Sequence, residues 1–312
     1  MGWTFPLLMI LVMVAIALFV PYLLFDRETI RLDETVRTSL PGNFIALYDG
    51  VTNYKLEGSD GGPIVVLIHG FSTPSRIWDY TAPALVDAGY RVLQYDLYGR
   101  GYSDRPFVDY DEELFDRQLI ELLSALGINS PVDLVGLSMG GAIAVIFAAR
   151  HPELVRKIVL VDPAGYPVPL PAMGRVVRMP VVGDYLMQVL GNHVIVRDGG
   201  ESLYHEEKLS ELLEIIKAQM VYRGYKRAIL STLRKFDLSD QRWAYETVGK
   251  KGLPVLLFWG REDSVIPFEN SAMVRNAITG TVFHAIDECG HIGNFERPEI
   301  VNPVMIEFLK ES

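Results

Sequence analysis

The sequence predicts an α/β protein whose mostly parallel sheet carries helices on both faces. Of its 312 residues, 49% are hydrophobic, which is enough to bury a sizeable core. Short continuous apolar runs alternate along the chain with amphipathic segments, as in successive βαβ units. A glycine-flanked serine directly follows one of these runs and precedes a helical segment, an arrangement typical of this class of sheet.

Composition narrows the classes of partner and cofactor. The formal net charge of −10 argues against a nucleic-acid partner, because binding to phosphates requires clustered Lys and Arg side chains. The single cysteine, Cys289, excludes an intrachain disulfide and a thiolate-cluster metal site. We therefore expect no nucleic-acid partner and no metal bound by cysteine thiolates, and we interpret Cys289 as a small buried side chain.

The N-terminus begins with a long apolar run. No charged residue occurs from Phe5 to Phe25, and about 20 apolar residues are enough for a spanning helix. We predict a transmembrane or signal-anchor segment over residues 1–25, which would make the protein membrane-associated with a single pass. A cleaved signal peptide, leaving a secreted or periplasmic protein, is an alternative, although residues 1–4 lack a basic side chain. A segment lying on the membrane or acting as a lid is a third. Residues 26–40 form a charged connector.

Eight short apolar runs predict the strands of the sheet. The first two are joined by Asp49-Gly50, a hairpin turn signal, and the later runs are continuously apolar, as expected for strands covered on both faces. The predicted strands cover residues 44–48, 51–56, 63–68, 92–95, 132–135, 158–161, 255–258 and 281–286. These runs place the core of the fold in residues 41–164 and 249–312.

Helical periodicity accounts for the segments between the strands. Apolar residues at helical spacing predict helices near residues 114–126, 142–149 and 299–309. Residues 162–254 break the alternation, since no continuous apolar strand occurs there, and the later half of this interval has helical spacing. We predict a helical cap, or lid, over residues 165–248, inserted after the sixth strand. The alternative is that these helices extend the core.

The segment Gly136–Gly141 predicts a nucleophile turn. Its sequence, Gly-Leu-Ser-Met-Gly-Gly, joins a buried strand to a helix, so Ser138 is placed above the carboxyl edge of the sheet. Such a turn is strained and tolerates only small residues two positions away on either side, which Gly136 and Gly140 provide. The adjoining helix N-terminus favours a developing negative charge. Ser138 is the predicted nucleophile.

A serine hydroxyl needs a base within hydrogen-bond reach, and that base needs a group that orients it. Among six histidines, His291 alone lies in a glycine-containing loop after the last strand, and we predict that it is the base. His69 ends the strand at 63–68 and is expected to shape the loop that follows. Asp263, after the strand at 255–258, is the predicted orienting acid; Asp162 is the rival, and Glu262 is a weaker candidate.

The tetrahedral intermediate of acyl transfer requires two hydrogen-bond donors, and backbone N–H groups serve well because they need not reorganise. Met139, directly after the nucleophile, is expected to supply one. The second is expected from the loop after the strand at 63–68, and we select the N–H of Phe71.

Taken in this order, these motifs resemble the α/β-hydrolase superfamily across nearly all of residues 40–312. Asp96–Asp104 looks like the structural D-x-x-G-x-G-x-S loop of that superfamily, and Trp259–Pro267 looks like its W-G-x-x-D-x-x-x-P acid loop. The elbow, the cap and the N-terminal run are similar to those of membrane-attached monoacylglycerol lipases and related carboxylesterases. The resemblance implies cofactor-independent hydrolysis of carboxylic esters.

The expected function is therefore that of a serine hydrolase acting on a small-molecule or lipid ester, monoacylglycerol-like or with a short- to medium-chain acyl group. One alternative is a hydrolase of carbon–carbon bonds in meta-cleavage products, which are dienone acids that need a cationic partner. Arg175, Arg178 and Arg223 are the candidates for that partner. Another alternative is a ligand receptor with the hydrolase fold and no turnover.

Overall fold

The computed structural model describes residues 4–168 and 172–311. Its centre is an eight-stranded sheet in the order β1-β2-β4-β3-β5-β6-β7-β8. Only β2 runs antiparallel to its neighbours, and the pairs from β4 to β8 are parallel. The strands are β1 (Asn43–Ala46), β2 (Val51–Glu57), β3 (Ile64–Ile68), β4 (Arg91–Tyr95), β5 (Val132–Leu137), β6 (Val155–Val161), β7 (Val255–Gly260) and β8 (Val282–Ile286). The predicted eight-stranded, mostly parallel α/β fold is confirmed.

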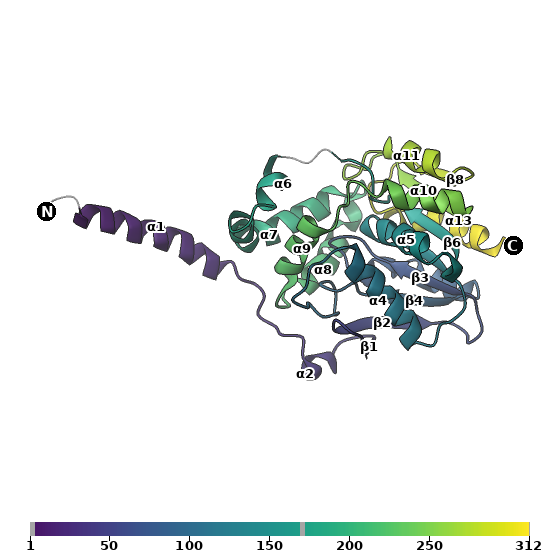
Figure 1. The fold of residues 1–312 in the computed structure, drawn as a ribbon, viewed down its shortest axis with the longest axis horizontal. Coiled ribbons are helices and arrows are strands. Elements are labelled where there is room, and N and C mark those ends of the chain that lie inside the picture. Colours follow the sequence, from purple (N-terminus) through teal and green to yellow (C-terminus); the bar gives the residue numbers. More distant parts are fainter. Residues whose placement is uncertain (1–3, 169–171, 312) are drawn as a thin grey trace.

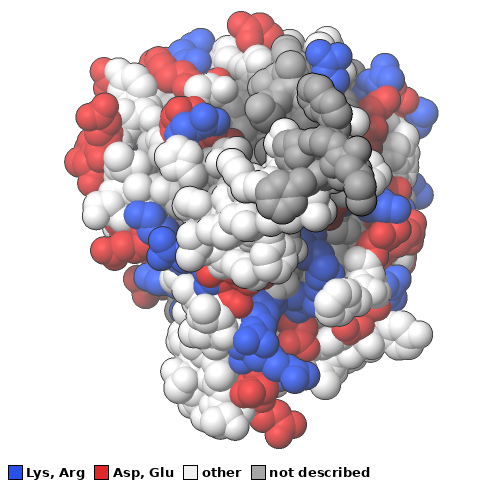
Figure 2. Space-filling model, turned by 90° about the vertical axis from the view of Figure 1, so that its left-hand side faces the viewer, with Lys and Arg blue, Asp and Glu red and all other residues white. Residues whose placement is uncertain are grey.

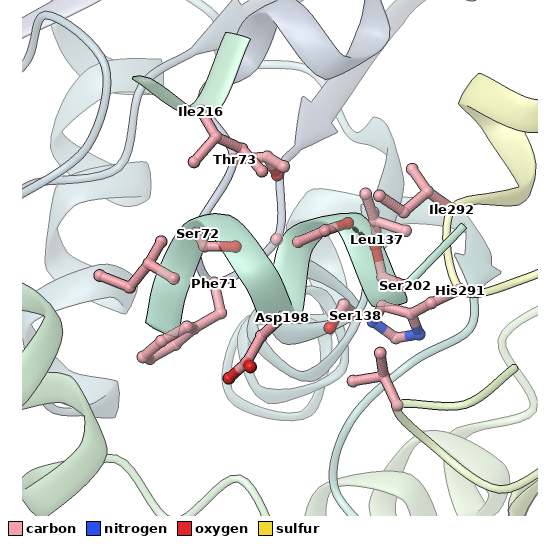
Figure 3. A pocket seen from close by; sticks show the side chains of 14 residues that line it. Phe71, Ser72, Thr73, Leu137, Ser138, Asp198, Ser202, Ile216, His291 and Ile292 are labelled. Atoms are coloured by element: carbon pink, nitrogen blue, oxygen red, sulfur yellow. Dashed lines mark hydrogen bonds between the residues drawn. The ribbon is translucent and has the colours of Figure 1, made fainter. Parts of the chain in front are cut away.

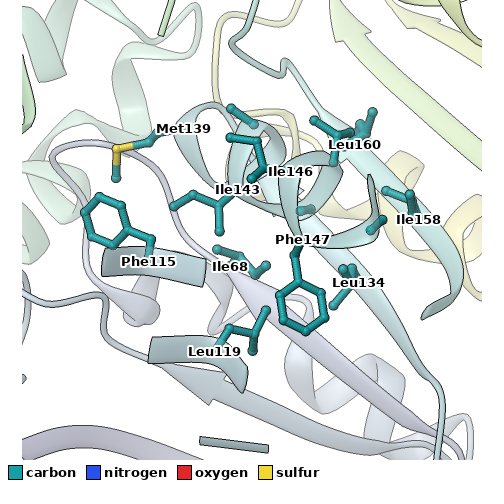
Figure 4. Packing of buried hydrophobic residues seen from close by; sticks show 14 of the residues in the cluster. Ile68, Phe115, Leu119, Leu134, Met139, Ile143, Ile146, Phe147, Ile158 and Leu160 are labelled. Carbon is teal, nitrogen blue, oxygen red and sulfur yellow. The ribbon is translucent and has the colours of Figure 1, made fainter. Parts of the chain in front are cut away.

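Both faces of the sheet are covered, which explains why its central strands are continuously apolar. Alternate residues of β3 belong to separate cores, with Val66 and Ile68 on one face and Val65 and Leu67 on the other. The helices that cover the first face are α4 (Glu112–Ala125), α5 (Met139–Arg150), α10 (Arg242–Lys251) and α11 (Asn270–Ala277). Figure 4 shows apolar side chains of α4 and α5 packed over strands of this face. The second face is covered by α3 (Ala82–Asp87), α12 (Gly293–Glu296) and α13 (Pro298–Lys310).

A helical insertion lies between β6 and β7, as predicted. It consists of α6 (Ala172–Val177), α7 (Val182–Glu201), α8 (Leu209–Gln219) and α9 (Tyr225–Lys235). These helices lie together at one end of the sheet, on the side from which the N-terminal helix projects (Figure 1). The predicted cap boundary at residue 248 lies inside α10, which packs against α5. The extent of the cap as a separate unit stays a prediction.

The remaining helical elements are short. They are α2 (Glu34–Arg37) and the 3₁₀ turns η1 (Ser75–Trp78), η2 (Pro152–Leu154) and η3 (Glu206–Lys208).

The N-terminal run forms α1 (Thr4–Leu24), which projects from the body of the protein (Figure 1) and contacts α7 through stacked Tyr22 and Tyr185 rings. On the face that carries α1, Lys and Arg side chains lie among Asp and Glu side chains (Figure 2). Among the helices within residues 4–168 and 172–311, none is long and apolar enough to cross a membrane. The prediction of a single-pass membrane anchor over residues 1–25 was therefore wrong.

The connector after α1 is hydrogen-bonded to the turn between α8 and α9 through Glu28 and Ile30, and these contacts are called the clasp below. Ile30 exchanges backbone hydrogen bonds with this turn, its N–H donating to Val221 and its carbonyl accepting from Arg223. The Glu28 carboxylate accepts from the N–H groups of Gly224 and Lys226, each at 2.6 Å. Since Gly224 is the N-cap of α9, a side chain from the connector satisfies the first turn of a cap helix.

Candidate active site

Ser138 occupies the sharp turn between β5 and α5. Its φ of 54° is rare for a residue with a side chain, and such strain persists only where the surroundings impose it. Two close approaches impose it here. A Cβ on Gly136 would lie 2.4 Å from the carbonyl oxygen of Gly140, and a Cβ on Gly140 would lie 2.2 Å from that of Ile68. The two glycines therefore allow the turn that presents the Ser138 hydroxyl above the sheet.

His291 and Asp263 meet at the same edge of the sheet. The Nδ1–H of His291 donates to Oδ2 of Asp263 at 2.8 Å, and His291 is only 7% exposed. The other carboxylate oxygen, Oδ1, accepts from the N–H groups of Val265 and Ile266 at 2.8 and 2.9 Å. The carboxylate is thus fixed by its own loop, and its remaining oxygen fixes the imidazole ring. The predicted base and its predicted orienting acid lie together.

Asp162, the rival acid, has different partners. Its Oδ1 accepts from the N–H of Gly260 at 2.8 Å, while its buried Oδ2 has no hydrogen-bond partner within the described residues. Complete burial, reinforced by the negative charge of Asp263, raises the pKa of Asp162 well above its usual value. Glu262, the third candidate, accepts from the N–H of Cys289 at 3.0 Å. The contact with His291 is made by Asp263.

His69 links the two loops that follow β3 and β4. Its Nδ1–H donates to the Gly70 carbonyl, and its Nε2 accepts from the N–H of Leu97, both at 2.9 Å. Burial lowers the pKa of His69 to about 4, so the ring is neutral near pH 7. This arrangement agrees with its expected role in shaping the loop that contains Phe71.

The two predicted oxyanion donors belong to different segments of the chain. Met139 begins α5 directly after Ser138, and Phe71 lies in the loop after β3. No backbone carbonyl in the described part of the chain accepts from the N–H of either residue. Arg100 holds the Phe71 loop from behind: its Nε donates to the Phe71 carbonyl at 3.0 Å, and its guanidinium lies 5.2 Å from the centre of the Phe71 ring.

Arg100 also connects this loop to the cap. It is fully buried, and its Nη1 donates to Oγ1 of Thr232, on α9, at 2.9 Å. Burial lowers the pKa of Arg100 to about 10, so its guanidinium remains charged near pH 7. From the sequence, Arg100 was expected only as part of the structural loop Asp96–Asp104.

Ser138 and His291 line one cavity of about 230 Å³ between the core and the cap (Figure 3). Its lining is Gly70, Phe71, Ser72, Thr73, Leu137, Ser138, Ile195, Asp198, Gly199, Ser202, Ile216, Val265, His291 and Ile292. Six of these side chains are apolar and six are polar, and Asp198 supplies the only carboxylate among the described residues of the lining. Sequence reasoning missed Asp198 and Thr73, because only the packing of the cap and of the loop after β3 brings them to Ser138.

The cap is tied to the loop that carries His291. The N–H of His291 donates to the carbonyl of Ser202, just after α7, at 2.8 Å. The buried carboxylate of Glu296 accepts from the N–H groups of Tyr204 and His205 at 2.7 and 3.1 Å. The end of α7 therefore has a fixed position relative to the predicted base.

In the described part of the chain, no group of three or more His, Cys, Asp or Glu side chains is placed to hold a metal ion. Cys289 is buried, as expected, and burial raises the pKa of its thiol.

Comparison with known proteins assigns the fold to a family. Residues 63–298 match the family described as alpha/beta hydrolase fold. The 2-hydroxy-6-oxo-6-phenylhexa-2,4-dienoate hydrolase of Comamonas testosteroni is 28% identical over 279 residues, covering 85% of this chain and 93% of that protein.

Solved structures show the same fold. The meta-cleavage product hydrolase of Pseudomonas fluorescens IP01 is 26% identical with a TM-score of 0.68, covering 86% of this chain and 97% of that one. The enol-lactonase of Burkholderia xenovorans LB400 is 23% identical with a TM-score of 0.75, covering 86% and 100%. These relatives do not support the narrower resemblance to membrane-anchored monoacylglycerol lipases.

Proposed function

Because the chain belongs to the alpha/beta hydrolase fold family, whose model matches residues 63–298, we propose that it is a serine hydrolase that cleaves carboxylic esters with short- to medium-chain acyl groups. The observation that carries the proposal is the shared cavity of Ser138 and His291, with Asp263 bonded to the far side of the imidazole. A nucleophile, a base and an orienting carboxylate converge there, which is the arrangement that acyl transfer requires.

In the proposed reaction, the Ser138 oxygen attacks the acyl carbon while Nε2 of His291 takes the hydroxyl proton. The N–H groups of Phe71 and Met139 donate to the resulting oxyanion. Collapse of the tetrahedral intermediate breaks the bond to the alcohol oxygen, which receives the proton from His291. Water then attacks the acyl-enzyme with His291 again as base, releasing the carboxylic acid and restoring Ser138.

Cleavage of a carbon–carbon bond in a meta-cleavage product is the second candidate, because two of the relatives act on such compounds by name. Those substrates carry a carboxylate. Within the described lining of the cavity there is no Lys or Arg side chain, and Arg175, Arg178 and Arg223 are not among the lining residues. The absence of a cationic side chain from the described lining therefore favours hydrolysis of esters over cleavage of carbon–carbon bonds.

The proposal is tested with the purified protein and its Ser138→Ala variant, using a fluorophosphonate probe, p-nitrophenyl esters and 2-hydroxy-6-oxo-6-phenylhexa-2,4-dienoate. We expect ester turnover and labelling in the parent protein and loss of both in the variant. Ser72→Ala, which removes another hydroxyl from the same cavity, should keep the labelling.

Three outcomes would contradict the proposal. Labelling that persists in Ser138→Ala would exclude Ser138 as the nucleophile. Turnover of the dienoate but not of any ester would establish the second candidate. Labelling without turnover of either class would favour a receptor with the hydrolase fold.

A further inference from the structure

The cavity contains a carboxylate that the proposed reaction does not use. Asp198 lies on α7 and lines the cavity together with Ser138 and His291, and Figure 3 shows its side chain extending from the helix on the side of Ser138 and Phe71. Neither the orienting role of Asp263 nor the oxyanion donors involve it. Its function must be sought in what the cavity binds.

One oxygen of the Asp198 carboxylate is available to a ligand. Oδ1 accepts from Nε and Nη2 of the neighbouring Arg197 at 3.0 and 2.7 Å, while no hydrogen bond to Oδ2 occurs within the described residues. Both side chains of this pair are about half exposed, and Arg197 does not line the cavity. Exposed pairs of this kind are weak, so Arg197 reduces the negative charge at Asp198 without removing it.

The position of Asp198 is held by contacts of the next helical turn. The carbonyl of Ser202 accepts from the N–H of His291, and the carbonyl of Glu201 accepts from the Ser264 hydroxyl, each at 2.8 Å. Both contacts join the end of α7 to loops that carry the predicted base and its orienting acid. The carboxylate therefore keeps its place beside the reacting groups.

A second polar group of the cavity lacks a protein partner. Thr73 is only 5% exposed, and its buried hydroxyl makes no hydrogen bond within the described residues. An ideal Cβ on Gly70 would lie 3.5 Å from both Oγ1 of Thr73 and Cβ of Ser138, so this hydroxyl lies close to the nucleophile turn. A buried hydroxyl without a partner is costly unless a ligand satisfies it.

We propose that Asp198 determines specificity by selecting esters whose alcohol part carries hydroxyl groups or a positive charge, and by rejecting esters whose alcohol part carries a carboxylate. The inference rests on the proposed ester hydrolysis and assigns its substrate class. The apolar side chains of the lining receive the acyl chain, and the polar side, with Asp198 and Thr73, receives the alcohol.

The test compares four butyrate esters that share the acyl group: propyl, 2,3-dihydroxypropyl, choline and carboxymethyl. In the parent protein we expect kcat/KM to be highest for the dihydroxypropyl and choline esters and lowest for the carboxymethyl ester. In Asp198→Asn, the preference for choline over propyl and the discrimination against carboxymethyl should each fall roughly five- to tenfold, the effect of one partly screened charge at close range. The propyl ester should change little.

Matched variants separate this role from general effects of charge. Asp184→Asn removes one negative charge from the same helix, away from both the cavity and Arg197, and should leave all four ratios unchanged. Thr73→Val removes the buried hydroxyl and should lower kcat/KM for the dihydroxypropyl ester relative to that for the choline ester. Loss of the dihydroxypropyl preference alone assigns the site to hydroxyl donors, and loss of the choline preference alone assigns it to cationic groups.

A readout without ester turnover keeps the two proposals distinguishable. Labelling rates of Ser138 are measured with fluorophosphonates carrying a trimethylammonium, a neutral or a carboxylate tail. We expect labelling to be fastest with the cationic tail and slowest with the anionic tail. In Asp198→Asn, the three rates should lie closer together. If the parent protein turns over no ester yet shows this order, the proposed function fails while the charge selection stands. Ratios that Asp198→Asn leaves unchanged would overturn the inference.

Discussion

Two carboxyl groups at the carboxyl edge of the sheet, Asp263 and Asp162, differ in what surrounds them. Asp263 accepts from three donors and contacts the imidazole, whereas Asp162 is enclosed with one oxygen unpartnered. Burial favours the neutral form of Asp162. An orienting group that stabilises an imidazolium must be charged, which favours Asp263 for that role.

Asp263→Asn should lower kcat on p-nitrophenyl butyrate by about 10³- to 10⁴-fold, because an amide neither fixes the reactive tautomer nor stabilises the imidazolium. Asp162→Asn keeps an acceptor for the N–H of Gly260 and should lower kcat less than about tenfold. Steady-state kinetics with melting temperatures for both variants check this. Equal losses in two folded variants would contradict the assignment.

His69 should make stability depend on pH. Its folded-state pKa of about 4 lies below the ordinary 6.5, so between these values the unfolded chain binds the extra proton. Its contribution to stability is therefore present above pH 6.5 and is lost as the pH falls toward 4. The difference corresponds to about 3 kcal/mol of unfolding free energy for this buried ring.

Urea unfolding of the parent protein and of His69→Gln between pH 7 and pH 4 measures this contribution. Glutamine does not titrate and offers an acceptor for the N–H of Leu97. Between pH 7 and pH 4, the unfolding free energy of His69→Gln should therefore fall by about 3 kcal/mol less than that of the parent protein. The raised pKa of Asp162 acts in the opposite sense in both proteins and cancels from the difference. Parallel profiles would show that His69 does not titrate in this range.

The predicted reaction residues could be selected from sequence because each is tied to a local pattern, and their roles stay predictions. Ser138 requires its glycines, and His291 and Asp263 follow strands that end at the same edge of the sheet. Asp198 and Thr73 have no such pattern. They reach the cavity only through the packing of segments far apart in the chain, so sequence spacing could not have identified them.

Among the helices, α7 shows why one element escaped prediction. Its buried positions are Gly183, Met187, Gly191, Ile195 and Gly199, a stripe at four-residue spacing in which three members are glycine. Glycine lowers helix propensity and carries no hydrophobic signal, so the periodicity is hidden. Tertiary packing requires the small residue: a Cβ on Gly199 would lie 2.5 Å from Cδ1 of Ile216 on α8.

The clasp between the connector and α9 gives a prediction for a single helix. Glu28→Ala leaves two N–H groups of the first turn of α9 without acceptors, and should lower stability by about 1 kcal/mol, the usual cost of a lost cap. Hydrogen exchange should accelerate at residues 224–228. Glu34→Ala, which removes the same charge from an exposed position in the connector, is the control. Unchanged exchange in α9 would show that the clasp does not support it.

For the whole molecule, the cavity depends on how the cap sits on the core. Ile216, on α8, lines the cavity, whereas its neighbour Ile215 lines a separate cleft. Ile216→Ala should shift the preference toward longer acyl chains, since each added methylene that finds buried space is worth about 0.8 kcal/mol. Relative kcat/KM values for butyrate, hexanoate and octanoate esters provide the measurement.

Ile215→Ala removes the same atoms from the same helix and should lower stability comparably without moving the chain-length preference. A similar shift in both variants would mean that loosening of α8, rather than space in the cavity, sets the preference.

A series of direct contacts runs from the connector into the site. Glu28 caps α9, Thr232 of that helix accepts from Arg100, and Arg100 donates to the carbonyl of Phe71, a predicted oxyanion donor. The predicted reaction residues are consequently supported by contacts that begin outside the segment that carries them. A chimera that borrowed only residues 63–298, the portion shared with the family, would carry every predicted reaction residue and lack the clasp that supports one of them from outside.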